Sequence, residues 1–472
     1  MSKASTWIPM RWPSGPLETA LQPGNKSVNE LWHKPESLNF LKGSPVNCIV
    51  VTWSADKPEV SSQQETLQPL IAHARQMGLG VIGRCSGSSR APSAGLDALL
   101  VEGPSTSAQE ISCAPAARLR AYPADVVAVD KAVWPKIPAR ATSGAGPTGS
   151  PWVDSNGWML LLAGAKAPGK ILWTLAEPAA DSPAIRPESY LLAIADSAAY
   201  GAQWVVALDP RLRGGLAGNA PDALSCWKTM TESLRFFAAH QEWRSYTQQS
   251  RLGVLSDFAG PNEYIGSEVL NLCNRRHLPY RVLDMDHLTA GSFDKLAAML
   301  LVSARPPEGA LRQQIDSYVK SGGVLIAPAS AAPMVAAGAP AGNFESRYDY
   351  FPAGKGKIAI ARKPWTDPYV LATDVHLILS RRHDVVRLWN AGVTNVRYTV
   401  SSQGKGLLQL VNYAMRPFGH PMSAYVAHPF GSARFVSLPG GESMRLDVVK
   451  RDGGIEIAIP PFAVFGAVEL GV

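Results

Sequence analysis

Ile171-Leu172-Trp173-Thr174-Leu175-Ala176-Glu177-Pro178 is a short apolar run that ends in a carboxylate and is stopped by a proline. It lacks the polar alternation of a half-exposed strand, and such a run is typical of a parallel strand covered on both faces. Similar runs recur through the first half of the chain, at residues 7–12, 47–53, 79–84, 96–102, 125–130 and 203–209.

Helical patterns separate several of these runs, for example residues 63–77 and 187–200, which carry apolar side chains at helical spacing. Alternating strands and helices imply a parallel sheet that is either closed into a barrel or doubly wound. No Gly-x-Gly-x-x-Gly sequence follows the first strand, so a dinucleotide-binding fold loses its main support. We therefore predict a TIM-type (β/α) barrel in which seven strands are identified and an eighth is assumed.

The chain of 472 residues is too long for one hydrophobic core, and its pattern changes twice. A second alternating α/β pattern begins near residue 251, and strands with turns replace helices after the Pro/Ala/Gly-rich segment 331–342. We predict a barrel over residues 1–247, a small flavodoxin-like α/β domain over 248–342 and an antiparallel β-sandwich over 343–472. The middle domain lacks a cysteine at a strand-to-helix elbow, so we expect no nucleophilic chemistry there.

The composition narrows the classes of partner and compartment. The formal charge of +7 is scattered, without a basic run interleaved with aromatics, so we expect no nucleic-acid partner. No apolar run is long enough to span a bilayer, so we expect no membrane partner. The five cysteines are dispersed, and we expect neither a metal nor another cofactor. The first residues lack the apolar segment of a signal peptide, which leaves the cytoplasm, or the periplasm or exterior if a signal was removed.

Carboxylates stand where several predicted strands end, and active sites of such barrels lie at the C-terminal ends of the strands. A further carboxylate lies in the loop Pro151-Trp152-Val153-Asp154-Ser155-Asn156-Gly157-Trp158, which is rich in groups that stack on sugars or hydrogen-bond them. Glycoside hydrolysis needs one carboxyl group as acid and a second as nucleophile or base. The candidate catalytic residues are Glu177, Glu102, Asp209 and Asp154. The structural alternatives are an arginine-paired carboxylate for Glu177 and a helix N-cap for Asp154.

Aromatic side chains near the predicted strand ends supply candidate contacts to a sugar, because their faces stack on pyranose rings. The candidate substrate-binding residues are Trp12, Trp53, Trp134, Trp152, Trp158, Asn156 and Arg84. Core packing is the alternative for each tryptophan. Arg11 and Arg84 also match the carboxylate of an acidic sugar such as a uronic acid, with pairing to nearby acids as the alternative.

Three stretches carry a resemblance to a known family: Pro187–Tyr190 through Trp204–Asp209, Gly253-Val254-Leu255-Ser256-Asp257 with Ser321–Ile326, and Gln409-Leu410-Val411-Asn412-Tyr413. With the order of the three predicted domains, they resemble the family 42 β-galactosidases and related barrel glycoside hydrolases. The resemblance implies a carbohydrate substrate, and a homo-oligomer formed through the middle domain.

The resemblance also implies an Asn-Glu pair at the end of the fourth strand, with Glu as acid/base, and a Glu nucleophile at the end of the seventh. By the predicted strand count these places hold Val101-Glu102 and Asp209. Three hypotheses follow: a glycoside hydrolase acting on a poly- or oligosaccharide, a catalytically degenerate barrel that binds a glycan, and a structural or oligomerisation protein.

Overall fold

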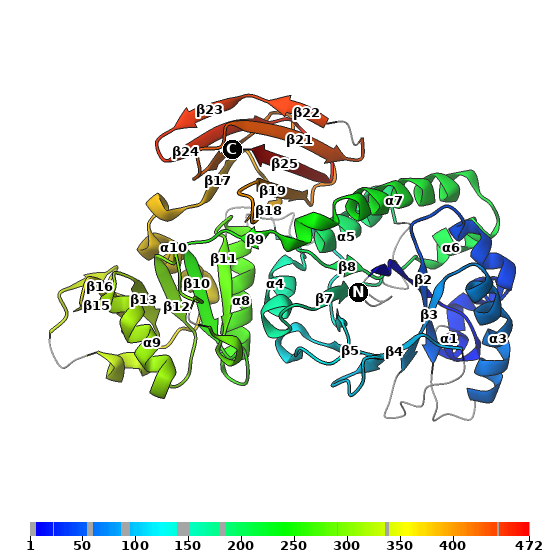
Figure 1. Ribbon diagram of the computed structural model, residues 1–472, viewed down its shortest axis with the longest axis horizontal. Helices are drawn as coiled ribbons and strands as arrows, with labels where there is room; N and C mark the ends of the chain where they lie inside the picture. The colour runs from blue at the N-terminus through cyan, green and yellow to red at the C-terminus, as the bar shows by residue number, and fades with distance from the viewer. Residues whose placement is uncertain are drawn as a thin grey trace.

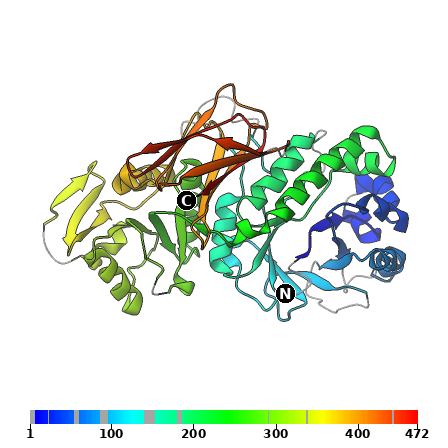
Figure 2. The same cartoon turned by 45° about the horizontal axis from the view of Figure 1, so that its top comes forward.

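The computed structural model describes residues 6–21, 23–53, 60–85, 95–138, 152–178, 185–289, 291–335, 339–440 and 443–471. A barrel and a smaller α/β unit lie side by side, and a β-sandwich lies over the junction between them (Figures 1 and 2). No helix in the described part of the chain has the length and apolar character needed to cross a bilayer.

The first unit is a ring of eight parallel strands that follow one another in chain order. They are β1 (Pro9–Trp12), β2 (Cys48–Trp53), β3 (Gly80–Cys85), β4 (Ala98–Glu102), β5 (Glu110–Ala114), β6 (Val126–Val129), β7 (Ile171–Thr174) and β8 (Gln203–Trp204). The ring closes just after β8, where Met10 pairs with Val206 and the Arg11 amide donates to the Val206 carbonyl at 2.7 Å. The predicted TIM-type barrel is confirmed.

One strand of the ring, β5, was absent from the predicted set, and this changes the strand count. No helix lies between β4 and β5 in the fully described segment 103–109, so the strand–helix alternation that reveals the other strands is missing. The run at 170–177 therefore holds the seventh strand, and the run at 203–209 holds the eighth. Assigning Asp209 to the end of strand seven was wrong.

Strand alternation divides the barrel side chains between two layers. Val50, Ile82, Leu100 and Trp173 belong to the apolar cluster that fills the interior. The intervening residues pack outward with the helices. These helices are α1 (Pro16–Leu21), α2 (Lys26–Trp32), α3 (Val60–Gln76), α4 (Gly157–Lys166), α5 (Pro187–Ala198), α6 (Pro210–Ala217) and α7 (Pro221–Ala239).

The middle unit contains a seven-stranded sheet in the order β11-β10-β12-β13-β16-β15-β14. Its strands are β10 (Leu252–Ser256), β11 (Tyr280–Asp284), β12 (Ala298–Leu301), β13 (Val324–Ala327), β14 (Gly342–Phe344), β15 (Tyr348–Ala353) and β16 (Gly356–Ala361). The first five in this order are parallel, and their order is that of a flavodoxin-like sheet. The helices are α8 (Asn262–Arg275), α9 (Gly309–Lys320) and α10 (Pro368–Leu379).

The end of the middle unit differs from the expected boundary at 342. Strands β15 and β16 hydrogen-bond into its sheet, and α10 packs on α8. We therefore propose that this unit extends to about Leu379.

The last unit is an antiparallel β-sandwich, as predicted. Its strands are β9 (Thr247–Gln248), β17 (Val386–Trp389), β18 (Thr394–Val400), β19 (Gly406–Asn412), β20 (Met422–Val426), β21 (Ser432–Leu438), β22 (Ser443–Leu446), β23 (Val448–Arg451), β24 (Gly454–Ile459) and β25 (Phe465–Gly471). They form two sheets, β17-β20-β24-β23 and β22-β21-β25-β19-β18-β9, around one apolar cluster.

Candidate functional site at the mouth of the barrel

Polar side chains line the interior of the barrel at the C-terminal ends of its strands. Each lies two residues beyond an apolar residue of the interior cluster, so alternation turns it to the same inner side. These residues are Thr52 after Val50, Arg84 after Ile82, Glu102 after Leu100, Asp130 after Ala128, and Glu177 after Leu175. Active sites of such barrels lie at this end.

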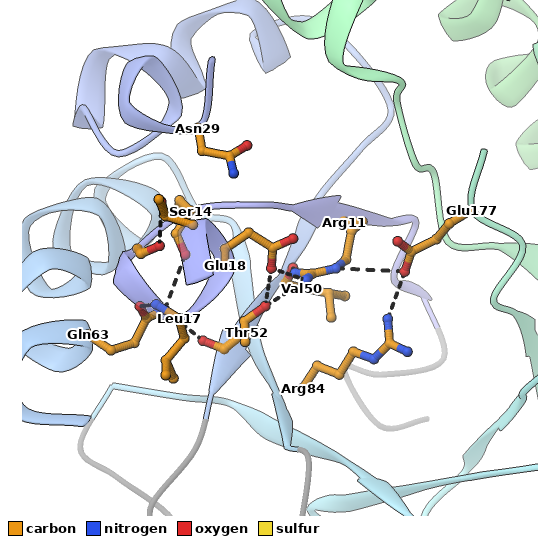
Figure 3. Close-up of polar contacts among 12 residues, drawn as sticks. Arg11, Ser14, Leu17, Glu18, Asn29, Val50, Thr52, Gln63, Arg84 and Glu177 are labelled. Carbon is orange, nitrogen blue, oxygen red and sulfur yellow. Dashed lines mark hydrogen bonds and ion pairs between the residues drawn. The ribbon is translucent and has the colours of Figure 1, made fainter. Parts of the chain in front are cut away.

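Glu177 lies between two guanidinium groups that come from neighbouring parts of the ring (Figure 3). Arg84 Nη1 lies 2.7 Å from Glu177 Oε1, and Arg11 Nε lies 3.8 Å from the same oxygen. The Glu177 side chain is still 38% exposed, so a solvent-borne ligand can reach it. The arginine-paired arrangement considered for Glu177 is therefore present, together with access from outside.

Arg11 is itself held against the barrel wall. Its Nη2 lies 2.5 Å from Glu18 Oε2 and donates to Thr52 Oγ1 at 2.6 Å, and its Nη1 donates to the Val50 carbonyl at 3.1 Å. Glu18 comes from α1 and also accepts a hydrogen bond from Thr52 Oγ1. These contacts hold the Arg11 side chain in one position beside Glu177 (Figure 3).

Two further carboxylates, Glu102 and Asp130, lie close enough to Cys113 of β5 to affect the pKa of its thiol. Burial raises the pKa of the Cys113 thiol to about 12; the Asp130 carboxylate adds to the rise, the Arg84 guanidinium opposes it, and Glu102 adds to it. Against the effect of burial, the carboxylates of Glu177 and Asp130 both raise the pKa of the Arg84 guanidinium. Glu177 and Asp130 therefore both lie near Arg84, and Glu102 lies near Cys113 on the neighbouring strand. Asp130 was not among the catalytic candidates, although it ends the predicted strand 125–130.

Asp209 has a structural role that its position after β8 explains. Its Oδ1 accepts hydrogen bonds from the amides of Arg211 (2.8 Å) and Leu212 (3.1 Å) at the start of α6, and its Oδ2 accepts one from the Tyr190 hydroxyl. The side chain is buried. Asp209 is thus the N-cap of α6.

The loop that contains Asp154 contacts the middle unit. Asp154 and Lys136 exchange backbone hydrogen bonds, and burial raises the pKa of the Asp154 carboxyl group. The guanidinium of Arg275, at the end of α8, lies 3.8 Å from the centroid of the Trp152 ring. The helix-cap alternative for Asp154 was wrong, because Asn156 occupies the N-cap position of α4.

Asn156 is also a structural residue. Its Nδ2 donates to the Val133 carbonyl at 2.9 Å and to Asp196 Oδ2 at 2.7 Å, and its Oδ1 accepts from the Val133 amide at 2.8 Å. Trp158, in the first turn of α4, is half-buried against the core. These contacts place the loop against α5 and α8, and the structure does not bring it beside Glu177.

Three further tryptophans pack in the layer outside the strands. Trp12 and Trp53 are buried there, and Trp12 Nε1 donates to the Trp32 carbonyl at 3.0 Å. Trp134 is half-buried and packs edge-on against Tyr190 and Trp204, with ring centroids 5.6 and 5.8 Å apart. These three tryptophans pack in or against the hydrophobic core.

A cavity of about 120 Å³ lies beside Glu177 at the mouth. Its charged lining residues are Arg11, Glu18, Glu177 and Arg213. Glu18 and Arg213 were missed because they come from α1 and α6, and only the closed ring brings these helices to one place. The described residues contain no group of three or more His, Cys, Asp or Glu side chains that could hold a metal ion.

A larger hollow of about 470 Å³ lies in the middle unit, between β15, β16 and α10. Its arginines, Arg347 and Arg362, are already paired with Asp374 and Asp349. This hollow lies away from the strand ends of the barrel, where the active sites of such folds are found.

No protein-family model matches the chain, and no curated protein matches it in sequence. Among solved structures, α-L-fucosidase isoenzyme 2 from Paenibacillus thiaminolyticus matches with a TM-score of 0.59 and 9% identity, over 93% of this chain and 96% of that one. A β-galactosidase from Bacillus circulans sp. alkalophilus matches with a TM-score of 0.48 and 9% identity, over 89% of this chain and 69% of that one. A rhamnosidase from Novosphingobium sp. PP1Y matches with a TM-score of 0.48 and 10% identity, over 86% and 38%.

The last two similarities are too distant to carry an argument, whereas the fucosidase covers nearly the whole of both chains. At 9% identity the likeness extends to the fold and not to a family or an activity. The chain thus has a fold found among glycoside hydrolases.

Proposed function

We propose that the protein is a glycoside hydrolase that cleaves a poly- or oligosaccharide with the carboxylates at the barrel mouth. The observation that carries this proposal is the position of two glutamates in the closed ring: Glu102 ends β4, and Glu177 follows β7. In the family 42 β-galactosidases, which the sequence resembles, the acid/base ends the fourth strand and a glutamate nucleophile ends the seventh. Counting β5 makes the seventh-strand residue a glutamate as well, while Val101 still stands in place of the asparagine.

The surroundings of the two glutamates suggest different roles. Glu177 lies against Arg84 and Arg11, which orient the carboxylate and suit a nucleophile or base. Glu102 is exposed and its side chain makes no hydrogen bond or ion pair with another described residue, so its carboxyl group is available to a ligand. We assign Glu102 as the acid that protonates the leaving oxygen. Glu177 then attacks the anomeric carbon or activates the water that does so.

A second candidate function is glycan binding without cleavage. The 2.7 Å pair between Arg84 and Glu177 favours it, because a nucleophile must leave such a partner at least in part in order to react. Turnover separates the two candidates: a binding protein retains a glycan that it never hydrolyses.

The test is hydrolysis of a panel of aryl glycosides and oligosaccharides by the wild-type chain and by Glu177→Gln and Glu102→Gln. Each substitution keeps the side-chain shape and removes the charge or the proton, so we expect rates to fall by at least about 10²–10⁴. Glu232→Gln on the exposed face of α7 is the matched control and keeps the wild-type rate. Hydrolysis that survives both mouth substitutions contradicts the assigned site.

A further inference from the structure

Arg213 is a buried cation without an anionic partner among the described residues. Its side chain lies in α6 and is 2% exposed. Nη1 donates to Asn29 Oδ1 at 2.7 Å, and Nε has no hydrogen-bond partner in the described part of the chain. The other two arginines of the mouth differ, because Arg11 is paired with Glu18 and Arg84 with Glu177.

Such a charge is costly to bury. A guanidinium taken from water without a carboxylate loses hydration that one amide oxygen and the Trp32 ring, whose centroid lies 5.8 Å away, do not replace. The pKa of Arg213 shows this cost, because burial lowers it to about 10 despite the carboxylates of the mouth. An anion that enters the site beside Arg213 would neutralise this buried charge and offset the lost hydration.

Two further buried donors belong to residues next to Arg213 or in the lining of the same cavity. Arg11 Nε and Asn29 Nδ2 have no hydrogen-bond partner among the described residues, and Asn29 is the residue that accepts the hydrogen bond from Arg213. Arg11 and Arg213 both line the cavity of about 120 Å³, which has room for a few water-sized groups. Figure 3 shows Arg11 and Arg84 directed toward Glu177, and Glu177 and Arg11 also line the cavity, so the cavity adjoins the proposed reaction centre.

We propose that this cavity binds the carboxylate of an acidic sugar, with Arg213 as the principal contact, and that the substrate is therefore a uronic-acid-containing glycan. This inference rests on the proposed function, because it names the class of sugar at the same site. A planar carboxylate matches the guanidinium fork, whereas a neutral hydroxyl does not offset the buried charge. The oxygens of Glu18 and Glu177 on the same wall favour a single negative charge over a dianion.

The experiment measures binding by isothermal titration calorimetry to the full chain. The probes are methyl glycosides of galacturonic and glucuronic acid, the matching neutral galactoside and glucoside, and a galactoside 6-sulfate. We expect the uronates to bind at least tenfold more tightly than the neutral sugars and more tightly than the sulfate. Arg213→Met abolishes this preference, and Arg211→Met, an exposed arginine of the same helix, retains it.

Thermal unfolding of the free variants separates ligand binding from a structural role. Arg213→Met removes the cost of the buried charge but also removes the hydrogen bond to Asn29 Oδ1, so the two effects oppose each other and we expect little change in the midpoint. A lower midpoint together with an unchanged sugar preference would give Arg213 a structural role and overturn the proposal.

The outcomes also separate this inference from the proposed function. Equal binding of acidic and neutral sugars, no binding of either, or a preference for the sulfate overturns the carboxylate site, even where neutral glycosides are hydrolysed. A uronate preference that depends on Arg213, in a chain that hydrolyses no glycoside, supports the site and refutes the hydrolase.

Discussion

Asp209 and Glu102 each end a predicted strand, yet Asp209 is a buried helix cap and Glu102 is exposed at the mouth of the barrel. Asp209 caps α6 through the Arg211 and Leu212 amides, so Asp209→Ala leaves these donors without a side-chain acceptor. We expect a loss of about 1–2 kcal/mol in the free energy of unfolding, and almost none for Asp209→Asn, because asparagine is an equally good cap. Denaturant unfolding measures both. An Asp209→Asn variant that is stable but has lost hydrolysis would return Asp209 to the catalytic candidates.

Three of the candidate residues lie on the inner side of the barrel, and the alternation of side chains along each strand explains their position. Arg84, Glu102 and Glu177 share the parity of the interior cluster, whereas Trp12 and Trp53 have the opposite parity and pack under the helices. The sequence did not separate these sets, because both faces of these strands are apolar and only the closed ring shows which parity faces inward. No local sequence pattern identifies Arg213 as a site residue, because it reaches the mouth only when the ring closes and α6 packs beside β1 and α1.

The strands themselves were predictable where helices separate them, and β5 was not. Its sequence, Glu110-Ile111-Ser112-Cys113-Ala114, is short and only partly apolar, and its connection from β4 contains no helix. The strand gains its stability from its neighbours, with parallel pairing to β4 and β6. A sequence pattern does not contain this tertiary contribution, so β5 was missed and the strand count was one too low. Asp209 was therefore assigned to the end of the seventh strand, which Glu177 follows.

The strand β7 offers a direct test of the filled barrel interior. Trp173 is fully buried there, with its ring centroid 6.4 Å from that of Trp7. Trp173→Ala opens a cavity between strands that cannot collapse, and we expect a loss of roughly 3–5 kcal/mol. Trp173→Phe refills most of the space and costs less. The thermal midpoint of the barrel transition measures both, and a loss below about 1 kcal/mol for the alanine variant would mean that the interior is not packed as described.

One buried ion pair joins the barrel to the middle unit. Lys166 of α4 lies 2.6 Å from Asp284 at the end of β11, and both side chains are 1% exposed. Lys166 Nζ also donates to the Asp257 carbonyl at 2.9 Å, just after β10. In flavodoxin-like sheets the C-terminal strand ends are the usual place for a ligand. In this protein Lys166 of the barrel lies at the C-terminal ends of β10 and β11, so these strand ends contact the barrel.

Lys166→Met leaves the buried Asp284 carboxylate with His287 as its one remaining side-chain partner among the described residues. We expect a loss of about 3–5 kcal/mol in stability, because removing one partner of a buried pair exposes the cost of the other charge. The double variant Lys166→Met/Asp284→Leu recovers most of this loss. Denaturant unfolding of the single and double variants gives the coupling between the residues. Additive losses would show that the pair does not act as a unit.

Asp196 connects the barrel with the β-sandwich. It lies in α5, is fully buried, accepts a hydrogen bond from the Tyr413 hydroxyl just after β19, and accepts two from Asn156. Burial raises the pKa of the Asp196 carboxyl group to about 6, although the hydrogen bonds from Tyr413 and Asn156 oppose the rise. The junction therefore contains a carboxyl group that titrates close to neutral pH.

The direction of the pH effect follows from this raised pKa. Below the ordinary aspartate pKa of 3.8, Asp196 is protonated in both the folded and the unfolded chain, and its contribution to stability is fully present. Between about pH 4 and 6 only the folded chain keeps the proton, so stability falls by roughly 3 kcal/mol as pH rises through the folded-state pKa. Asp196→Asn removes this part of the pH dependence. Unfolding of both chains from pH 4.5 to 7.5 measures the difference, in which the other carboxyl groups cancel. Parallel curves would mean that Asp196 does not take up a proton in this range, and that its hydrogen bonds alone keep the carboxylate charged inside the junction.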